Sequence, residues 1–348
     1  MRLFAAFLTL LYLCVSQPLP LDASSVPPVS KSAFDAVPAP ISVLPVTIEA
    51  NRIHFTAMVS GKPLIFLLDT GSTTSVVFES ASLPAEMFNL GPTVKVAFPA
   101  LNRTAQSQRI HNLKLDLSGI SFDATDSVFM NQNEKVNLHL DRNYDGIVGQ
   151  EFFRTFTVEI DPQTLTLSLY PTGTDLAKYY QIGHKVRMSD GLPHIRHRSK
   201  MPWEQRASPK DLLLDTGYPG HVVIWDRRQF RAAFGFYTSH QKSGILTLGT
   251  LTFGNLSFVN TPIFVSGKIP KNLTKRDGIF GASLLNQFKH VIDFENKQIL
   301  IRPLYHANGA PMQFVDGQIY TPANEKYVLR LYEDHNRRNG DFTFQILE

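Results

Sequence analysis

Two copies of one short motif carry the residues of this sequence that are best suited to chemistry. The tripeptide Asp-Thr-Gly ends an apolar run at residues 64–68 and recurs after a second apolar run at residues 212–214. A short apolar run closed by glycine is typical of a buried strand that leads into a tight turn. Each copy therefore predicts a carboxylate delivered into a turn by a buried strand. One copy alone would mean little, so the surrounding sequence has to show whether the two belong together.

An internal repeat makes the two tripeptides equivalent positions. The pattern Asp-Gly-Ile-x-Gly follows each of them once, at residues 145–149 and 277–281. In both copies a Phe lies 11 residues after the leading Asp, a second Asp lies 16 residues after it, and a β-type run follows. Because self-similarity of this kind marks duplicated structural units, we expect each half to contain the tripeptide, a set of strands, the second pattern, a short helix and a final strand.

Two equivalent carboxylates have a defined chemistry if they meet on a pseudo-twofold axis. Carboxylates about 3 Å apart cannot both ionise easily, so they share one proton and titrate as a unit. The ionised member can accept a proton from a water held between them while the protonated member hydrogen-bonds a peptide carbonyl. This is general acid–base amide hydrolysis without a covalent enzyme species. The candidate catalytic residues are Asp69 and Asp215.

The neighbours of these two residues have types suited to an active-site loop. Glycine allows a sharp turn that brings backbone N–H groups close to the carboxylates. Threonine offers a short hydroxyl that can cross the axis and lock the two halves together. The residues expected to support the loops are Thr70, Gly71, Ser72, Thr216 and Gly217.

In their order and in their recurrence in both halves, these motifs resemble those of the aspartic proteases. The resemblance covers roughly residues 42–304; the short halves resemble the retropepsin-like branch, here fused in tandem as in the bilobal pepsin-like enzymes. It implies an all-β, bilobal acid-protease-type fold, with two homologous β-barrel-like lobes and the Asp pair at the floor of a cleft between them. It also implies endopeptidase activity without a metal or cofactor, and structural roles for Asp145 and Asp277. The partner would be a peptide or protein substrate in extended conformation, bound as an added strand.

Two stretches depart from the family pattern. Tyr218 follows the second tripeptide, where a small residue is usual, and could alter the surroundings of Asp215 or occlude part of the cleft. The flap expected at roughly residues 99–113 contains no Tyr, although retropepsin-like flaps manage with backbone and aliphatic contacts. An alternative therefore stays open: a noncatalytic peptide-binding protein of the same fold with a compromised second active-site loop.

The length of the chain and the residue patterns of its parts indicate several segments. A chain of 348 residues exceeds what one hydrophobic core usually serves. Residues 327–332 and 342–347, joined across Asn339-Gly340, have the pattern of a β-hairpin. The expected segments are a signal peptide (1–16), a Pro-rich leader or linker (17–41), an N-terminal aspartic-protease lobe (42–172), a linker (173–184), a C-terminal aspartic-protease lobe (185–305) and a C-terminal extension (306–348) that forms this hairpin.

The N-terminus and the cysteine content bear on location. Arg2 followed by a largely apolar stretch at residues 3–15 is typical of a secretory signal, and the stretch is too short to span a membrane comfortably. An uncleaved anchor is the alternative. Cys14 is the only cysteine, so the mature protein would have no disulfide, which favours a bacterial periplasm or exterior. We therefore expect an exported protein, periplasmic or extracellular, without a stable membrane span. Three glycosylation triplets, at Asn102, Asn255 and Asn272, point the other way.

Charge and histidine spacing exclude several other classes. A net charge of +4 is too mild and too scattered to argue for nucleic acid. The histidines show no convincing metal-ligand spacing. Since both halves are present in one chain, we expect a monomer with pseudo-twofold lobes. The densest basic stretch, residues 185–210, has seven Lys and Arg against Asp190 and Glu204. It is either a solvated loop or edge-strand face, or a patch that steers substrate.

Overall fold

The structure is a computed structural model, and it describes only part of the chain. The described residues are 37–98, 103–137, 144–180, 182–201, 204–225, 244–253, 256–266, 277–303, 314–315, 318–320 and 344–346. The chain divides into two units, Met1–Val37 and Pro38–Glu348, and everything below concerns the second. The predicted signal peptide, most of the predicted leader and all three glycosylation triplet asparagines lie outside the described residues. Within the described ranges, no helix has the length and apolar character needed to cross a membrane.

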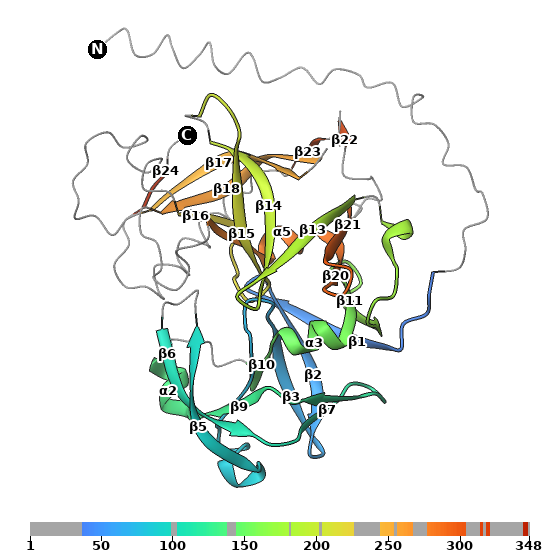
Figure 1. Cartoon of the computed structure of the whole chain (residues 1–348), viewed down its shortest axis with the longest axis vertical. Helices are drawn as coiled ribbons and strands as arrows, with labels where there is room; N and C mark the ends of the chain where they lie inside the picture. Colours follow the sequence, from blue (N-terminus) through green and yellow to red (C-terminus); the bar gives the residue numbers. More distant parts are fainter. Residues whose placement is uncertain are drawn as a thin grey trace, which may run out of the picture. The chain divides into compact units, whose positions relative to one another are not determined.

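Strands dominate the described part of the chain (Figure 1). They link into one mixed network of parallel and antiparallel pairs that does not close on itself. The described α-helices are short: α2 (Gln132–Asn137), α3 (Gln150–Thr155) and α5 (Ala282–Leu285). The predicted all-β class is therefore confirmed.

Most strands of the first half coincide with apolar runs of the sequence, whereas β6 (Arg103–Ile110) is largely polar. Side chains point alternately to the two faces of a strand, as in the first strand, whose residues from Ser42 to Thr47 are alternately buried and exposed. The strands are β1 (Ser42–Glu49), β2 (Arg52–Val59), β3 (Lys62–Leu68), β4 (Ser75–Phe78), β5 (Leu90–Phe98), β6 (Arg103–Ile110), β7 (Leu113–Asp116), β8 (Ser121–Ala124), β9 (Ser127–Met130), β10 (Gly146–Val148), β11 (Phe156–Asp161) and β12 (Thr166–Pro171).

The second half repeats the plan of the first. Its strands are β13 (Ile182–Ser189), β14 (Leu192–Lys200), β15 (Ser208–Asp215), β16 (Val222–Trp225), β17 (Gly244–Phe253), β18 (Leu256–Ser266), β19 (Gly278–Gly281), β20 (Phe288–Asp293) and β21 (Gln298–Pro303). In the first half β10 pairs parallel with β3 and antiparallel with β4. In the second half β19 pairs in the same two ways with β15 and β16. The sequence repeat is thus matched by a repeat of strand pairing.

Short strands lie in the C-terminal region. β22 (Phe314–Val315) pairs antiparallel with β23 (Gln318–Tyr320), and β24 (Phe344–Ile346) pairs parallel with β17. Residues 327–332, one strand of the predicted hairpin, lie outside the described residues, so that hairpin stays a prediction.

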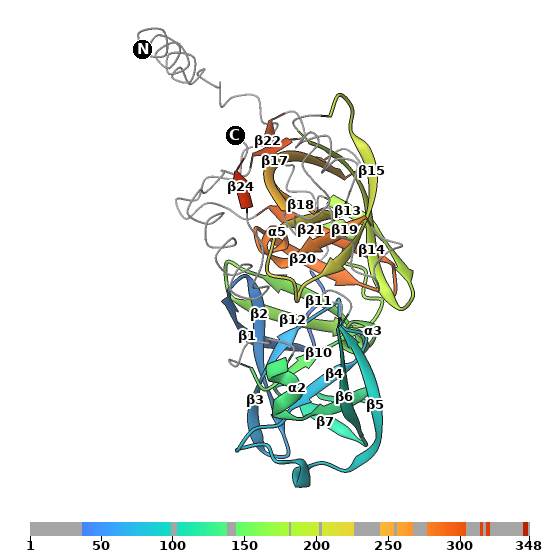
Figure 2. The ribbon, with the colours of Figure 1, turned by 90° about the vertical axis from the view of Figure 1, so that its left-hand side faces the viewer.

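An antiparallel sheet joins the two halves. Its strands follow the order β1, β12, β11, β20, β21 and β13, and the central pair β11–β20 brings one strand from each half together (Figure 2). The residues that follow β12 pack onto this sheet, with Leu176 fully buried against Tyr170, Val291 and Leu300. The halves are therefore connected by backbone hydrogen bonds as well as by the covalent chain.

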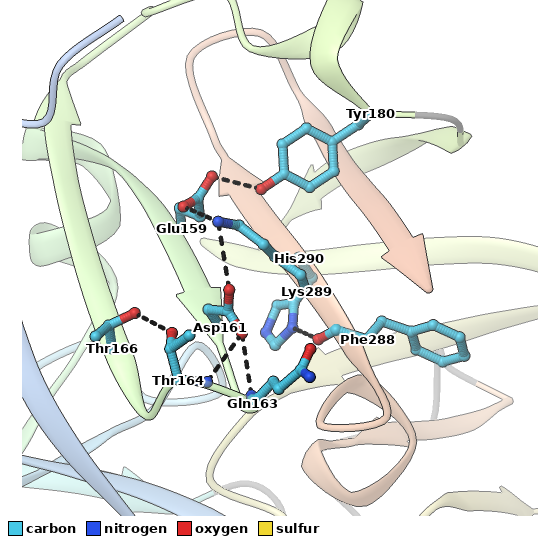
Figure 3. Close-up of polar contacts among 9 residues, drawn as sticks. All are labelled: Glu159, Asp161, Gln163, Thr164, Thr166, Tyr180, Phe288, Lys289 and His290. Atoms are coloured by element: carbon cyan, nitrogen blue, oxygen red, sulfur yellow. Dashed lines mark hydrogen bonds and ion pairs between the residues drawn. The ribbon is translucent and has the colours of Figure 1, made fainter. Parts of the chain in front are cut away.

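A charged cluster lies on this central pair of strands (Figure 3). The Lys289 ammonium from β20 is 2.6 Å from a Glu159 carboxylate oxygen and 3.5 Å from an Asp161 oxygen, both on β11. The Tyr180 hydroxyl donates to the second Glu159 oxygen at 2.5 Å. Burial and the Glu159 carboxylate raise the pKa of Tyr180, so its phenol stays protonated and keeps donating. One cation thus bridges two carboxylates across the junction of the halves.

Replacing this cation is expected to destabilise the fold. Lys289→Met leaves Glu159 and Asp161 without their cation although their side chains are only 8% and 13% exposed. Loss of one partner of a buried ion pair costs about 3 kcal/mol, measurable as a lower free energy of unfolding in urea. The control is Lys114→Met, since the Lys114–Asp123 pair is 68% and 63% exposed and should contribute under about 1 kcal/mol. Equal effects of the two substitutions would contradict the structural role of the cluster.

Candidate functional site

The structure brings the two predicted carboxylates together. Asp69 follows β3 directly, and Asp215 is the last residue of β15. Their carboxyl groups are close enough that each affects the pKa of the other. Asp69 is partly exposed whereas Asp215 is 4% exposed. The pair is thus mostly buried, and Asp69 is its more exposed member.

Two buried threonines tie the tripeptides to each other with reciprocal hydrogen bonds. The Thr70 hydroxyl donates to the Leu214 carbonyl at 2.7 Å and accepts from the Thr216 N–H at 3.0 Å. The Thr216 hydroxyl donates to the Leu68 carbonyl at 2.8 Å and accepts from the Thr70 N–H at 3.0 Å. Each hydroxyl therefore crosses to the opposite half, as the sequence predicted. Because both side chains are fully buried, water cannot replace these bonds.

Glycine is required beside each carboxylate because the two loops approach closely. A Cβ atom on Gly71 would lie 2.6 Å from the Asp215 carboxyl carbon, and one on Gly217 would lie 2.4 Å from the Asp69 carboxyl carbon. Real Cβ atoms do not approach other heavy atoms so closely. The glycines thus leave room for the carboxylate of the opposite half, which adds a second reason for them to the turn that the sequence suggested.

The surroundings raise the pKa values of both carboxyl groups. Burial raises the pKa of Asp69, although the Gly71 N–H, which donates to it at 2.7 Å, works in the opposite direction. Burial and the charge of Asp69 raise the pKa of Asp215 well above its ordinary range, opposed by the Tyr218 N–H, which donates at 2.9 Å. Because two such groups interact strongly, their protons are lost in steps that belong to the pair and not to either residue alone.

Asp145 and Asp277 use their carboxylates to brace the strands that carry the pair. Asp145 accepts a hydrogen bond from the Ile65 N–H of β3 at 2.9 Å. Asp277 accepts one from the Asp211 N–H of β15 at 2.8 Å. The two contacts occupy matching positions four residues before Asp69 and Asp215. These carboxylates therefore fix strand positions and do not join the central pair.

Ser72 and Tyr218 occupy matching positions but have different surroundings. The Ser72 hydroxyl donates to the Thr74 carbonyl at 2.7 Å, within its own loop. The Tyr218 ring lies so close to Gly220 and Gly281 that Cβ atoms there would be 2.4 and 2.6 Å from ring carbons. The same ring packs against the cluster of buried apolar residues around Trp225. The bulky residue is thus accommodated by two glycines of its own half.

Polar side chains that the sequence interpretation missed support each loop differently. In the first half the buried Gln150 amide donates to the Thr70 carbonyl at 3.2 Å and is held in turn by Arg154. In the second half the buried His221 ring lies 2.8 Å from the Ser283 hydroxyl and 3.0 Å from the Gln287 amide. Burial lowers the pKa of His221 to about 4, so the ring is neutral near pH 7. The only feature of the sequence that could have indicated such a role is the position of Gln150, which directly follows the repeated motif Asp-Gly-Ile-Val-Gly.

A tight turn of the first half also contacts the second loop. Asn51, in the two-residue turn between β1 and β2, donates through its amide to the Pro219 carbonyl at 3.1 Å. Its own carbonyl accepts from the Asn286 amide at 2.7 Å. Asn51 has a φ of +64°, a conformation that asparagine tolerates better than most residues. The loop that carries Asp215 is therefore supported from both halves.

The segment predicted as a flap belongs to a hairpin. β5 and β6 pair antiparallel from Leu90↔Ile110 to Phe98↔Arg103, and the tip at residues 99–102 lies outside the described residues.

In the described ranges, no three His, Cys, Asp or Glu side chains gather so that they could hold a metal ion.

Comparison with known proteins adds no assignment. No protein-family model matches the chain, and no curated protein matches it with significant similarity.

Removing one threonine hydroxyl is expected to weaken the contact between the halves. Thr216→Val leaves the buried Thr70 N–H and Leu68 carbonyl without their partner, which costs about 3 kcal/mol. Urea unfolding measures the loss. Thr216→Ser keeps the hydroxyl and should retain most of the stability. A valine variant as stable as the serine variant would show that the crossing bonds do not hold the halves together.

Neutralising the buried carboxyl group is expected to stabilise the protein at neutral pH. Because the pKa of Asp215 is raised above 3.8, the folded state binds this proton more tightly than the unfolded chain does, and stability falls as pH rises above about 3.8. Asp215→Asn removes this pH-dependent loss of stability. The variant should therefore be more stable than the wild type at pH 7, and the difference between them should vanish in acid. Thermal unfolding between pH 3 and 8 measures it.

Asp123→Asn, at a side chain 63% exposed, is the control for this experiment and should follow the wild type at every pH. A stability difference for Asp215→Asn that does not change with pH would contradict the tight binding of the proton.

Proposed function

We propose that the protein is an exported aspartic endopeptidase with a two-lobed acid-protease-type arrangement. The observation that carries this proposal is the Asp69–Asp215 pair, placed on equivalent loops of two repeated halves and locked by the reciprocal Thr70–Thr216 bonds. Two coupled carboxyl groups with raised pKa values are the arrangement that general acid–base hydrolysis requires.

In the proposed reaction the two carboxyl groups have different tasks. Ionised Asp69 accepts a proton from a water molecule held between the carboxyl groups, and the oxygen of that water bonds to the peptide carbonyl carbon. Protonated Asp215 hydrogen-bonds the carbonyl oxygen and stabilises the tetrahedral intermediate. Asp69 then passes the proton that it accepted from water to the departing nitrogen, the C–N bond breaks, and the products are a carboxylic acid and an amine. No covalent bond between enzyme and substrate forms.

The substrate of such a site would be a peptide or protein in extended conformation. The proposal assigns the β5–β6 hairpin as the flap that covers it, with backbone hydrogen bonds supplying affinity and pockets supplying side-chain preference. The enzyme would act as a monomer, since both carboxylates come from one chain. The proposed export to a periplasm or exterior rests on the sequence of residues 1–16.

One observation favours a second candidate, a noncatalytic peptide-binding protein of the same fold. Tyr218 stands where the family has a small residue, and its ring is partly buried beside the loop that carries Asp215. Against this candidate, the Tyr218 backbone still donates to Asp215 at 2.9 Å, so the bulky side chain has not displaced that contact.

Substituting the paired carboxylates is expected to abolish hydrolysis. Asp69→Asn and Asp215→Asn should each lower the rate of cleavage of a denatured protein at least about 100-fold, because each removes a member of the acid–base pair. Circular dichroism checks that the variants fold. A statine-containing peptide, which mimics the tetrahedral intermediate, should inhibit the wild type. If folded variants cleave as fast as the wild type over acid to neutral pH, the catalytic proposal is wrong.

The pH dependence of the reaction should report the raised pKa values. The rate falls in acid when Asp69 becomes protonated and falls in alkali when Asp215 loses its proton. As the pKa of Asp215 is raised, the alkaline limb is expected above the ordinary range of carboxyl groups. The dependence of kcat/KM on pH measures both limbs, and a rate that is independent of pH from 3 to 8 would contradict the assignment.

A further inference from the structure

The basic stretch of the sequence forms an exposed row of cations on one strand. In β14 the side chains of Arg196, Arg198 and Lys200 are exposed, whereas the intervening His197 and Ser199 are buried. Because side chains alternate between the two sides of a strand, the three cations lie on one side of it. Neighbouring cations are separated by about 6.6 Å along the strand. The strand therefore holds the three charges of this basic row at a regular spacing.

The surface of the basic row is separate from the candidate catalytic pair. Leu192 and His194 lie on the same side of β14 as the row, but each is only 3% exposed. Leu213, opposite His194 on β15, is 1% exposed and belongs with Leu192 to the cluster of buried apolar residues around Trp225. Exposure on this side of β14 thus begins at Arg196. A ligand of the row would bind outside the candidate catalytic site.

The carboxylates near the row are engaged by other groups. Asp211 lies opposite Arg196 on β15, and its oxygens are 3.8 Å from Arg187 and 3.5 Å from His194. Glu204, which follows β14, accepts a hydrogen bond from a backbone N–H at 2.7 Å. Among the described residues, no ion pair involves any of the three cations of the row. Their charge therefore faces solvent without being balanced.

The backbone of β14 has strands on both edges where the row lies. One edge pairs with β15, and the other pairs with β13 near the start of β14 and with β17 near its end (Figure 1). A polypeptide that binds as an added strand gains its affinity from an open backbone edge. A ligand of the basic row has to bind through the side chains instead.

The side chains beside the row are small or polar. Arg198 lies opposite Pro209 of β15 and Thr252 of β17, and Lys200 lies opposite Thr250. No aromatic residue is among the described partners of the row on these two strands. Single-stranded nucleic acids stack their bases on aromatic side chains, and membrane interfaces take up exposed aromatic and aliphatic side chains. The surface of the row instead offers charge and hydrogen-bond donors.

From this arrangement we propose that the basic row binds a linear acidic polysaccharide, a chain of sugars that carries sulfate or carboxylate groups. Arg196 and Arg198 each present a planar guanidinium that can bind such an anion through paired N–H donors, and Lys200 adds a compact positive charge. The Arg198 guanidinium also donates to the Ala207 carbonyl at 2.7 Å, which holds its direction without neutralising its charge. A sugar chain that lies along β14 meets the three cations in turn.

The test uses the full chain with a fluorescently labelled heparin fragment as the probe, and anisotropy reports the Kd. The wild type is expected to bind the fragment, and raising the salt concentration to about 0.5 M should weaken binding at least about tenfold, because exposed charges are screened. The triple variant Arg196→Gln, Arg198→Gln and Lys200→Gln should bind at least about tenfold more weakly than the wild type, since it loses its charge-assisted hydrogen bonds to the anion. Circular dichroism checks that the variant folds.

A matched control removes the same amount of charge elsewhere. The triple variant Lys95→Gln, Lys114→Gln and Lys178→Gln changes exposed residues outside β13, β14, β15 and β17. Its Kd for the heparin fragment should differ less than about twofold from that of the wild type, because charges separated by more than the Debye length of about 8 Å are largely screened.

The comparison of the two variants decides the proposal. Weaker binding by the row variant but not by the control supports it. No binding by the wild type at low salt, or equal weakening in both variants, overturns it. A single-stranded oligonucleotide, a polyglutamate peptide or vesicles of anionic phospholipid that bind about tenfold more tightly than heparin would also overturn it. Since Asp69→Asn should bind heparin as the wild type does, the result is independent of whether the protein hydrolyses peptides.

Discussion

The reciprocal hydrogen bonds of Thr70 and Thr216 are the interaction on which the candidate site depends. Two carboxyl groups in a mostly buried position repel one another once both ionise, and burial disfavours their charged forms. The crossed hydroxyls hold the two loops at a fixed separation despite this cost, because their partners are buried backbone groups that would otherwise be unsatisfied. Separating the loops would lose four hydrogen bonds at once. This enforced proximity adds the charge of Asp69 to burial as a cause of the raised pKa of Asp215.

The strand framework around the pair is symmetric, whereas its side chains are not. Asp145 and Asp277 brace equivalent strands with equivalent hydrogen bonds. The loops are supported by different groups, an amide from Gln150 in one half and the neutral ring of His221 in the other. The difference extends to the residues that carry the carboxyl groups, since Asp215 is 4% exposed and Asp69 is partly exposed. Asymmetry of this kind lets two identical side chains serve as acid and base, which the proposed reaction needs.

The sheet that joins the halves sets the frame in which these contacts form. The pair β11–β20 and the charges of Glu159, Asp161 and Lys289 connect the halves away from the tripeptides. The Asn51 turn adds a contact from the first half to the loop of the second. Because several separate elements restrain the two halves, the carboxyl groups are positioned before any substrate binds. Such preorganisation is the condition under which electrostatic stabilisation is effective.

Local pattern was enough for the all-β class, the strands that end at Asp69 and Asp215, the equivalence of the two halves and the crossing threonines. These features depend on short-range periodicity and on an internal repeat, and both can be read directly from the sequence. The supporting roles of Gln150, His221 and Asn51 could not be predicted, because their partners lie 80, 62 and 168 residues away and only the folded sheets bring them into contact. The density of positive charge at residues 185–210 was visible in the sequence. Which of these cations are exposed (Arg196, Arg198 and Lys200) and which is buried (Lys210) was decided by the tertiary structure. Strand register determines which face each side chain occupies.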